Sequence, residues 1–144
     1  MGLVAILVDF QLLISRATTN KTETSRENWE MQIFHNPRCS KSRQTLQLIA
    51  EAAQEVEVIE YLQNPPTVEE LRGVVSLLGI TARELVREGE VVFRDLDVDL
   101  STLSDDAVIE LIVANPILMQ RPIVVGNGTA IIGRPPENVL QLWT

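Results

Sequence analysis

Segments with the apolar patterns of strands and helices alternate along residues 31–144, and their order constrains the fold more than any other feature of the sequence. Short strand-like segments at 32–34 and 56–61 enclose a segment in which apolar residues recur at helical spacing. Several helical segments follow. Two further strand-like segments, 123–125 and 130–132, precede a last helical segment. The predicted order is therefore β-α-β, a group of helices, and then β-β-α.

Capping residues mark the ends of several predicted helices. Thr67 and Glu70 predict a capping box, and the same spacing at 81–84 predicts a second, shorter helix over 81–87. Ser104 predicts the start of another helix, since a serine hydroxyl can bond the free backbone N–H groups there. Residues 89–103, just before it, are acidic and expected to be irregular.

The C-terminal segments complete the predicted topology. Gly126-Asn127-Gly128 between two apolar segments predicts a β-hairpin, and Pro135-Pro136 predicts the start of the last helix. The order β-α-β followed by β-β-α is the thioredoxin-like arrangement. We therefore expect an α/β, thioredoxin-like fold with a helical insertion between the halves, formed by residues 31–144 as one domain.

The first thirty residues do not fit this alternation. An apolar run over 1–15 contains Asp9, and a polar stretch follows over 16–30. The run lacks the basic start and the small-residue cleavage site of a signal peptide, and it is too short and polar to span a bilayer. We expect residues 1–30 to be a poorly structured extension. A further interpretation is that translation starts at Met31, because the alternation of strands and helices is complete without the residues before it.

The charge and the cysteine count exclude several classes of function. A formal net charge of −8 disfavours binding to nucleic-acid phosphates. The chain has one cysteine, Cys39, and one histidine, His35, which excludes an intramolecular disulfide and a zinc site built from several thiolates. A free thiol suits the reducing cytoplasm. An external thiol must reduce Cys39 if it becomes oxidised.

The motif H-N-P-R-C-S-K-S-R at 35–43 places Cys39 where a strand-like segment passes into a helix. Free backbone N–H groups and the positive end of the helix dipole would face the thiol, with Arg38, Lys41 and Arg43 nearby. Such surroundings lower a cysteine pKa from about 8.5 to between ~3.5 and ~7.5. The same donors would hold an oxyanion beside the sulfur. The alternative is a small buried residue without chemistry, against which the polar flanks argue.

Neighbouring residues narrow the chemistry of this cysteine. Ser42 occupies the second position of a C-x-x-C-like motif, so Cys39 is expected to act as a monothiol nucleophile. Thr45 stands where a phosphatase P-loop would need arginine, which excludes that class. Acidic residues over 95–106 form no complete calcium loop, so a metal site is not expected.

Three arginines, Arg87, Arg121 and Arg134, are candidates for binding an oxyanion. Arg121 and Arg134 each precede a proline and flank the predicted hairpin. If that hairpin pairs beside the first strand, both approach the Cys39 loop. The planar guanidinium suits a tetrahedral oxyanion because it binds two oxygens at once, whereas solvated surface is the alternative for any single arginine.

Two features of this region stay open from the residues alone. Pro122, at the start of a strand, could follow a cis or a trans peptide bond. His35 either supports the thiolate as a nearby cation or hydrogen-bond donor, or is a strand-end histidine with one backbone hydrogen bond.

Together these motifs resemble the glutaredoxin-dependent arsenate reductase family, from about Met31 to Trp143. The resemblance rests on five ordered motifs: H-N-P-R-C-S-K-S-R at 35–43, E-Y-L-Q-N-P-P-T at 60–67, L-G-I-T-A-R-E-L-V-R at 78–87, N-P-I-L-M-Q-R-P-I-V-V at 115–125 and G-R-P-P-E at 133–137. Several ordered motifs at matching separations are far more specific than a lone cysteine.

The resemblance implies a function and a role for each site residue. It implies that Cys39 attacks arsenate and that Arg87, Arg121 and Arg134 hold the oxyanion. It also implies that His35 depresses the cysteine pKa. Arsenite would be formed with glutathione as co-substrate and glutaredoxin as partner, with no bound cofactor and neither a nucleic-acid nor a membrane partner.

The chain also departs from the family pattern, which keeps other classes open. Many characterised reductases have Gly-Thr after the cysteine, where this chain has Ser40-Lys41. The alternatives are a monothiol glutathione-linked redox protein and a redox-sensing regulator that binds a protein partner such as RNA polymerase. Such regulators often carry C-x-x-C, which Ser42 interrupts here.

Overall fold

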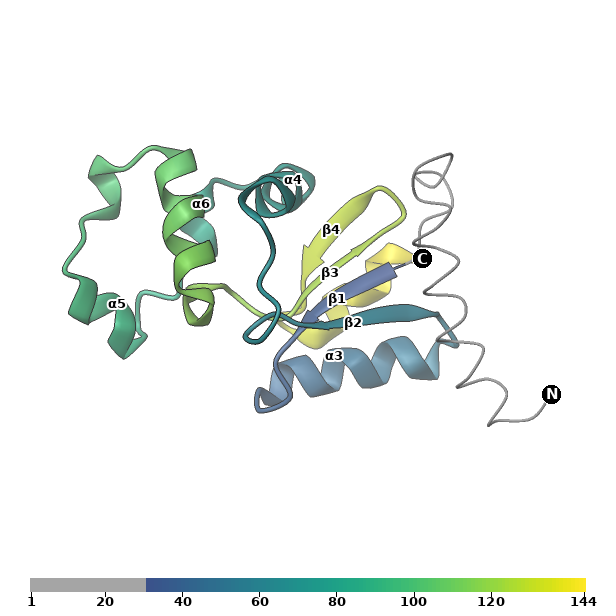
Figure 1. Cartoon of the computed structure of the whole chain (residues 1–144). Coiled ribbons are helices and arrows are strands. Elements are labelled where there is room, and N and C mark those ends of the chain that lie inside the picture. The colour runs from purple at the N-terminus through teal and green to yellow at the C-terminus, as the bar shows by residue number, and fades with distance from the viewer. Residues whose placement is uncertain (1–30) are drawn as a thin grey trace.

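A computed structural model describes residues 31–144, which form a four-stranded sheet with helices on both faces (Figure 1). The strands are β1 (Met31–His35), β2 (Val56–Glu60), β3 (Ile123–Gly126) and β4 (Thr129–Ile132), in the order β2-β1-β3-β4. β1 pairs parallel with β2 and antiparallel with β3, and β3 pairs antiparallel with β4. This is the predicted β-α-β and β-β-α arrangement.

The helices fall into two groups on opposite sides of the sheet. α3 (Ser40–Glu51) connects β1 to β2 and packs against η4 (Pro136–Leu142), a 3-10 helix at the C-terminus. The insertion lies on the side away from α3 (Figure 1). It consists of α4 (Val68–Leu78), η1 (Ala82–Leu85), α5 (Val91–Leu96), η2 (Leu100–Thr102), α6 (Asp105–Ala114) and η3 (Pro116–Leu118).

Alternation along the central strands divides the core between the two faces. Ile33 and Val124 belong to a cluster completed by α3 and η4, whereas Phe34 and Ile123 belong to a larger cluster with α4 and α6. Successive side chains of a strand point to opposite faces, so strands covered on both faces are apolar at every position. This explains why β1 and β3 read as short continuous apolar runs.

Local signals placed most element boundaries correctly. The Thr67 hydroxyl accepts a hydrogen bond from Glu70 N–H at 3.0 Å, and Thr67 N–H donates to the Glu70 carboxylate at 2.9 Å, which completes the predicted capping box. Ser104 caps α6 as expected. The hairpin turn has positive φ at Asn127 and Gly128, the backbone of a type I′ turn.

Two expectations about the elements were wrong in part. Residues 89–103 are not irregular throughout, because α5 and η2 form within them; Val92 and Phe93 pack on the larger core cluster and stabilise this short helix. The last helix is a 3-10 helix. The expectations for residues 1–30 lie outside the described residues.

Two classes of feature are absent from residues 31–144. No helix in this range combines the length and apolarity needed to cross a membrane. No cluster of three or more His, Cys, Asp or Glu side chains is placed there to bind a metal ion.

Candidate active site

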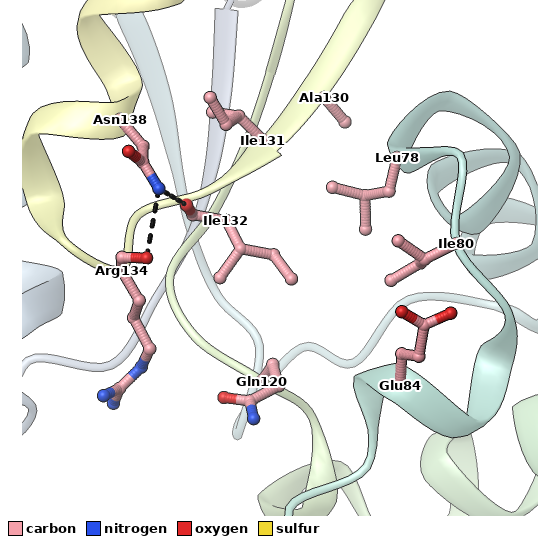
Figure 2. Close-up of a pocket in the computed structure, with 9 residues that line it drawn as sticks. All are labelled: Leu78, Ile80, Glu84, Gln120, Ala130, Ile131, Ile132, Arg134 and Asn138. Atoms are coloured by element: carbon pink, nitrogen blue, oxygen red, sulfur yellow. Dashed lines mark hydrogen bonds between the residues drawn. The ribbon is translucent and has the colours of Figure 1, made fainter.

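A hollow of about 380 Å³ opens between the end of α4 and β4 (Figure 2). The Asn138 amide donates to the carbonyl oxygens of Ile132 and Arg134. The Glu84 carboxylate accepts from Thr81 in a second capping box. Leucine, isoleucine and alanine side chains form much of the remaining lining, and Gln120 and Arg134 complete it.

The candidate site lies at the edge of the hollow, where α3 begins. Cys39 is the N-cap residue of α3, and its own N–H donates to Asn36 O at 2.9 Å. Its side chain is 8% exposed. The position follows from topology: β1 ends at His35, and the following loop must turn the chain into the first helix at the carboxyl edge of the sheet. The sulfur therefore faces free N–H groups of the first helical turn.

Hydrogen bonds within the loop hold Cys39 in place. The buried Ser42 hydroxyl accepts from Asn36 N–H at 3.0 Å and lies 2.6 Å from His35 Nδ1. Asn36 Oδ1 accepts from Arg38 N–H at 3.0 Å, and the Arg43 guanidinium donates to Pro37 O at 2.8 Å. The polar side chains of the loop thus bond mainly its own backbone, and these bonds hold its geometry without a ligand.

The structure places His35 against Ser42 rather than against the sulfur. Burial lowers the pKa of His35; Glu60 opposes this effect and Arg43 adds to it. The ring is therefore neutral near neutral pH. No hydrogen bond among residues 31–144 joins it to Cys39, so any effect of His35 on the thiol passes through the loop.

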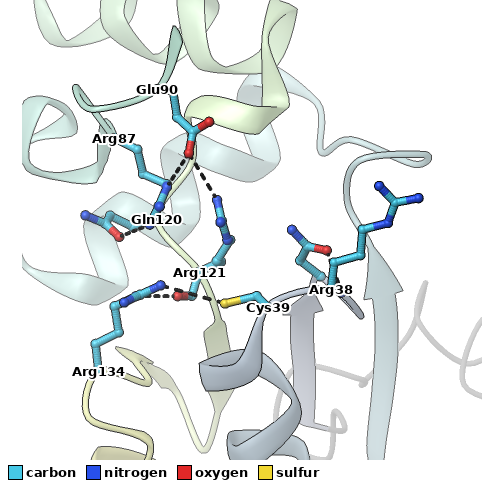
Figure 3. Close-up of polar contacts among 8 residues, drawn as sticks. Arg38, Cys39, Arg87, Glu90, Gln120, Arg121 and Arg134 are labelled. Atoms are coloured by element: carbon cyan, nitrogen blue, oxygen red, sulfur yellow. Dashed lines mark hydrogen bonds and ion pairs between the residues drawn. The ribbon is translucent and has the colours of Figure 1, made fainter. Parts of the chain in front are cut away.

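The three candidate arginines lie on one side of Cys39 (Figure 3). Arg134 Nη2 is 3.7 Å from Cys39 Sγ, and Arg134 Nε donates to Arg121 O at 2.8 Å. Glu90 Oε2 lies 3.2 Å from Arg87 Nε and 3.8 Å from Arg121 Nη1, so one carboxylate pairs with both guanidinium groups. We refer to Arg87, Arg121, Arg134 and Glu90 as the arginine wall.

The pKa of Cys39 is lowered, in part for the reason expected. Burial raises it, but the backbone N–H of Ser42 and the Arg121 guanidinium outweigh that effect, and the backbone N–H of Lys41 adds to them. The side chains of Arg38, Lys41 and Arg43 are not among these causes. Arg38 extends away from the sulfur (Figure 3). The backbone N–H groups of the helix N-terminus contribute as expected, and the main guanidinium contribution comes from Arg121.

A close contact beside Gly133 joins the arginine wall to α3. A Cβ atom on Gly133 would stand 2.5 Å from Thr45 Oγ1 and 2.9 Å from Pro122 Cγ. Real Cβ atoms do not approach so closely, so glycine is required here. The peptide bonds before Pro122 and Pro135 are both cis. At Gly133, the backbone between Arg121 and Arg134 packs directly against Thr45 of the helix that begins at Cys39.

Sequence reasoning missed three residues of the site. Glu90 and Gln120 contact the arginines, and Tyr61 is fully buried on the same side of the sheet. Glu90 stood in a segment expected to be irregular, and Gln120 had no distinguishing pattern. The signal for Tyr61 was available, since it directly follows β2, whose carboxyl end lies beside that of β1.

Comparison with known proteins connects this geometry to a family. The ArsC family model matches residues 34–142. The chain is 50% identical over 114 residues to "Uncharacterized protein YfgD" of Escherichia coli K12, covering 78% of this chain and 96% of that protein. It is 43% identical over 111 residues to an arsenate reductase of Neisseria meningitidis serogroup B, covering 76% of this chain and 95% of that enzyme.

A solved structure agrees with these sequence relatives. The arsenate reductase from Vibrio cholerae superposes with a TM-score of 0.74 at 44% identity. The match covers 78% of this chain and 96% of the other. The similarity therefore extends over nearly all of residues 31–144.

Proposed function

The chain belongs to the ArsC family and has its thioredoxin-like fold, and from this we propose that it reduces arsenate to arsenite through an adduct on Cys39. Relatives and a solved neighbour that bear the name arsenate reductase support this activity. One observation carries the proposal: a buried thiol with a lowered pKa lies 3.7 Å from Arg134 and is influenced by Arg121. That arrangement is suited to a nucleophile that attacks an anion.

In the first step, the Cys39 thiolate attacks the arsenic atom of bound arsenate. An S–As bond forms, an As–O bond breaks, and the departing oxygen leaves as water after taking up protons. Arg87, Arg121 and Arg134 offset the charge of the oxyanion, without which two anions would repel each other. The lowered pKa of Cys39 supplies the thiolate without a general base.

Reduction then requires thiols from outside the chain. Arsenic(V) takes up two electrons to become arsenic(III), and two thiols supply them as they become one disulfide. Since the chain has a single cysteine, we propose glutathione as the co-substrate that attacks the adduct and glutaredoxin as the partner that completes the reduction. Water then breaks the S–As bond, its oxygen going to arsenic and a proton to sulfur, so that arsenite leaves and Cys39 returns as a thiol. We place the reaction in the reducing cytoplasm.

We propose that His35 supports the nucleophile indirectly. Its contact with Ser42 at 2.6 Å fixes the hydroxyl that also binds Asn36 N–H, and Ser42 N–H lowers the pKa of Cys39. The ring thus positions the loop and supplies no charge of its own.

The test measures arsenite formation with arsenate, glutathione and glutaredoxin. Cys39→Ser should lower the rate by on the order of 10³-fold or more, since the nucleophile is lost. Arg38→Gln is the matched control, because Arg38 adjoins Cys39 but extends away from it. Equal rates for wild type and Cys39→Ser would refute the nucleophile. Omitting glutaredoxin, or replacing it with thioredoxin, tests the reductant separately.

The competing classes make opposite predictions in the same assay. A general glutathione-linked reductase would reduce a glutathionylated peptide and keep that activity after Arg121→Gln, since no oxyanion needs binding. A redox regulator would show stoichiometric oxidation of Cys39 without turnover, and retention on an RNA polymerase column. Arsenate turnover that falls with Arg121→Gln distinguishes the proposed enzyme from both.

A further inference from the structure

Three buried side-chain atoms have no hydrogen-bond partner within residues 31–144, and they belong to two residues. They are the Tyr61 hydroxyl oxygen and the Nε and Nη1 atoms of Arg121. The Nη1 atom is 3.8 Å from the Glu90 carboxylate, which is an ion pair longer than a hydrogen bond. Native proteins leave few buried polar groups unpaired, and each one calls for an explanation.

Topology brings Tyr61 to the same edge of the sheet as the thiol. Tyr61 directly follows β2, which is parallel to β1, and Glu60 at the end of β2 pairs with His35 at the end of β1. The loop that carries Cys39 leaves β1 at this edge. Tyr61 is 0% exposed and is packed in the larger core cluster, so its ring is fixed.

The charges that act on Tyr61 are those of the candidate site. Burial raises the pKa of the Tyr61 phenol; the charge of Arg121 and the approach of its guanidinium to the phenol oxygen lower it, the Cys39 thiolate raises it and Arg87 lowers it. An N–H group of Arg121 that approaches the phenol oxygen leaves the phenol O–H free to donate. The hydroxyl therefore lies close enough to the arginine wall and the sulfur to sense both. With a raised pKa it stays protonated near neutral pH and remains a hydrogen-bond donor.

We propose that Tyr61 donates a hydrogen bond to an oxygen of the bound oxyanion, beside Arg121, both before and after the S–As bond forms. The donor keeps its proton throughout, so no proton transfer by Tyr61 is involved. This role rests on the proposed function and adds a neutral donor to the three arginines.

The chemistry of the unpaired groups favours an oxyanion as their partner. A phenol O–H and the N–H groups of two guanidinium nitrogens need several acceptors, and a tetrahedral oxyanion presents oxygens in several directions. The sulfur atoms of a mixed disulfide are weak acceptors and would leave these donors unpaired. Tyr61 thus favours oxyanions over disulfide substrates. The positive charge of the arginines alone would not give this specificity.

The experiment measures oxyanion binding apart from turnover. Arsenate bound beside Cys39 should slow the alkylation of the full-length protein by iodoacetamide, and the concentration that halves the alkylation rate gives an apparent affinity. Tyr61→Phe removes only the hydroxyl oxygen and should weaken this affinity by roughly 10- to 100-fold, as expected for a lost hydrogen bond to an anion. The melting temperature should stay the same or rise, because an unpaired buried hydroxyl is removed.

Two further variants distinguish the loss of the Tyr61 hydroxyl from a change in core packing. Phe34→Leu alters the same core cluster without touching a polar atom, and it should leave the affinity nearly unchanged. Arg121→Lys combined with Tyr61→Phe should cost less than the two changes added together, because both side chains bind one ligand. Equal affinity of Tyr61→Phe and wild type, or an equal loss in Phe34→Leu, would overturn the role of Tyr61.

The same assay separates this proposal from the proposed function. A protein that binds arsenate with the predicted dependence on Tyr61 but forms no arsenite would refute the reductase and support the Tyr61 contact. Full turnover in Tyr61→Phe with unchanged affinity would support the reductase and refute the contact.

Discussion

The Cys39 loop and the arginine wall face each other across the candidate site. Within residues 31–144, the buried side-chain atoms without a hydrogen-bond partner include atoms of the wall but none of the loop. In the loop, Ser42, Asn36 and Arg43 bond groups at most seven residues away in the sequence, at 2.6–3.0 Å. In the wall, Arg121 has two atoms without partners in the described part of the chain. Arg87 reaches Gln120 at 3.5 Å, a long contact.

This difference indicates a division of labour between the two regions. A loop that its own hydrogen bonds hold in place without a ligand can keep the thiolate in position for attack. A wall with free donors can form strong hydrogen bonds only when an anion arrives. The loop is therefore expected to contribute to stability, and the wall to ligand affinity.

The largest expected effect comes from breaking the contact that joins the two regions. Gly133→Ala would force its Cβ against Thr45 and Pro122 and should lower the free energy of unfolding by about 1–3 kcal/mol. Urea denaturation measures the change. Gly73→Ala is the matched control, since nothing lies within 4 Å of a Cβ there and α4 should gain about 0.5–1 kcal/mol. Equal changes in both variants would contradict the close contact.

The loop itself is tested by removing the hydroxyl at its centre. Ser42→Ala leaves Asn36 N–H and the His35 ring without their buried partner and should cost about 1–3 kcal/mol of unfolding free energy. Ser40→Ala, exposed in the same helical turn, serves as the control and should change stability little. If Ser42→Ala proved neutral, the loop would not be the stabilising region.

The third prediction locates the cause of the lowered pKa of Cys39. Arg121→Gln should raise this pKa and slow alkylation by iodoacetamide near neutral pH, whereas Arg38→Gln should change neither. Because the folded pKa lies below the unfolded one, the associated stability is present at high pH and is lost as pH falls through the folded value. The pH profile of the alkylation rate measures the shift. A larger change in Arg38→Gln than in Arg121→Gln would show that the basic side chains of the loop, not Arg121, lower the pKa of Cys39.

The smallest expected effect concerns the carboxylate in the wall. Glu90→Gln removes the negative charge that pairs with Arg87 and Arg121, so arsenate should protect Cys39 at a concentration about two- to fivefold lower. Glu88→Gln, an exposed change in the same segment, controls for net charge. Weaker protection in Glu90→Gln would show that the carboxylate positions the arginines more than it competes with the anion.

Much of the fold could be predicted because its signals act over short distances along the chain. The capping box at Thr67 and the hairpin turn at Asn127 involve residues that are at most three positions apart. The helix over Val91–Leu96 was missed because its stability comes from packing on the larger core cluster rather than from its own sequence.

For the site, the sequence by itself determined the thiol and its loop, and only the tertiary structure decided the ligand pocket. Cys39, Ser42 and the start of α3 lie within one short segment, so backbone geometry brings them together however the rest of the chain packs. Arg134 contacts the Cys39 sulfur although the two residues are 95 positions apart in the sequence, and Arg87 contacts Gln120 at a separation of 33 positions. Contacts at such separations depend on the register of the sheet and the packing of the insertion, so the unpaired donors of Arg121 and Tyr61 became visible only in the folded structure.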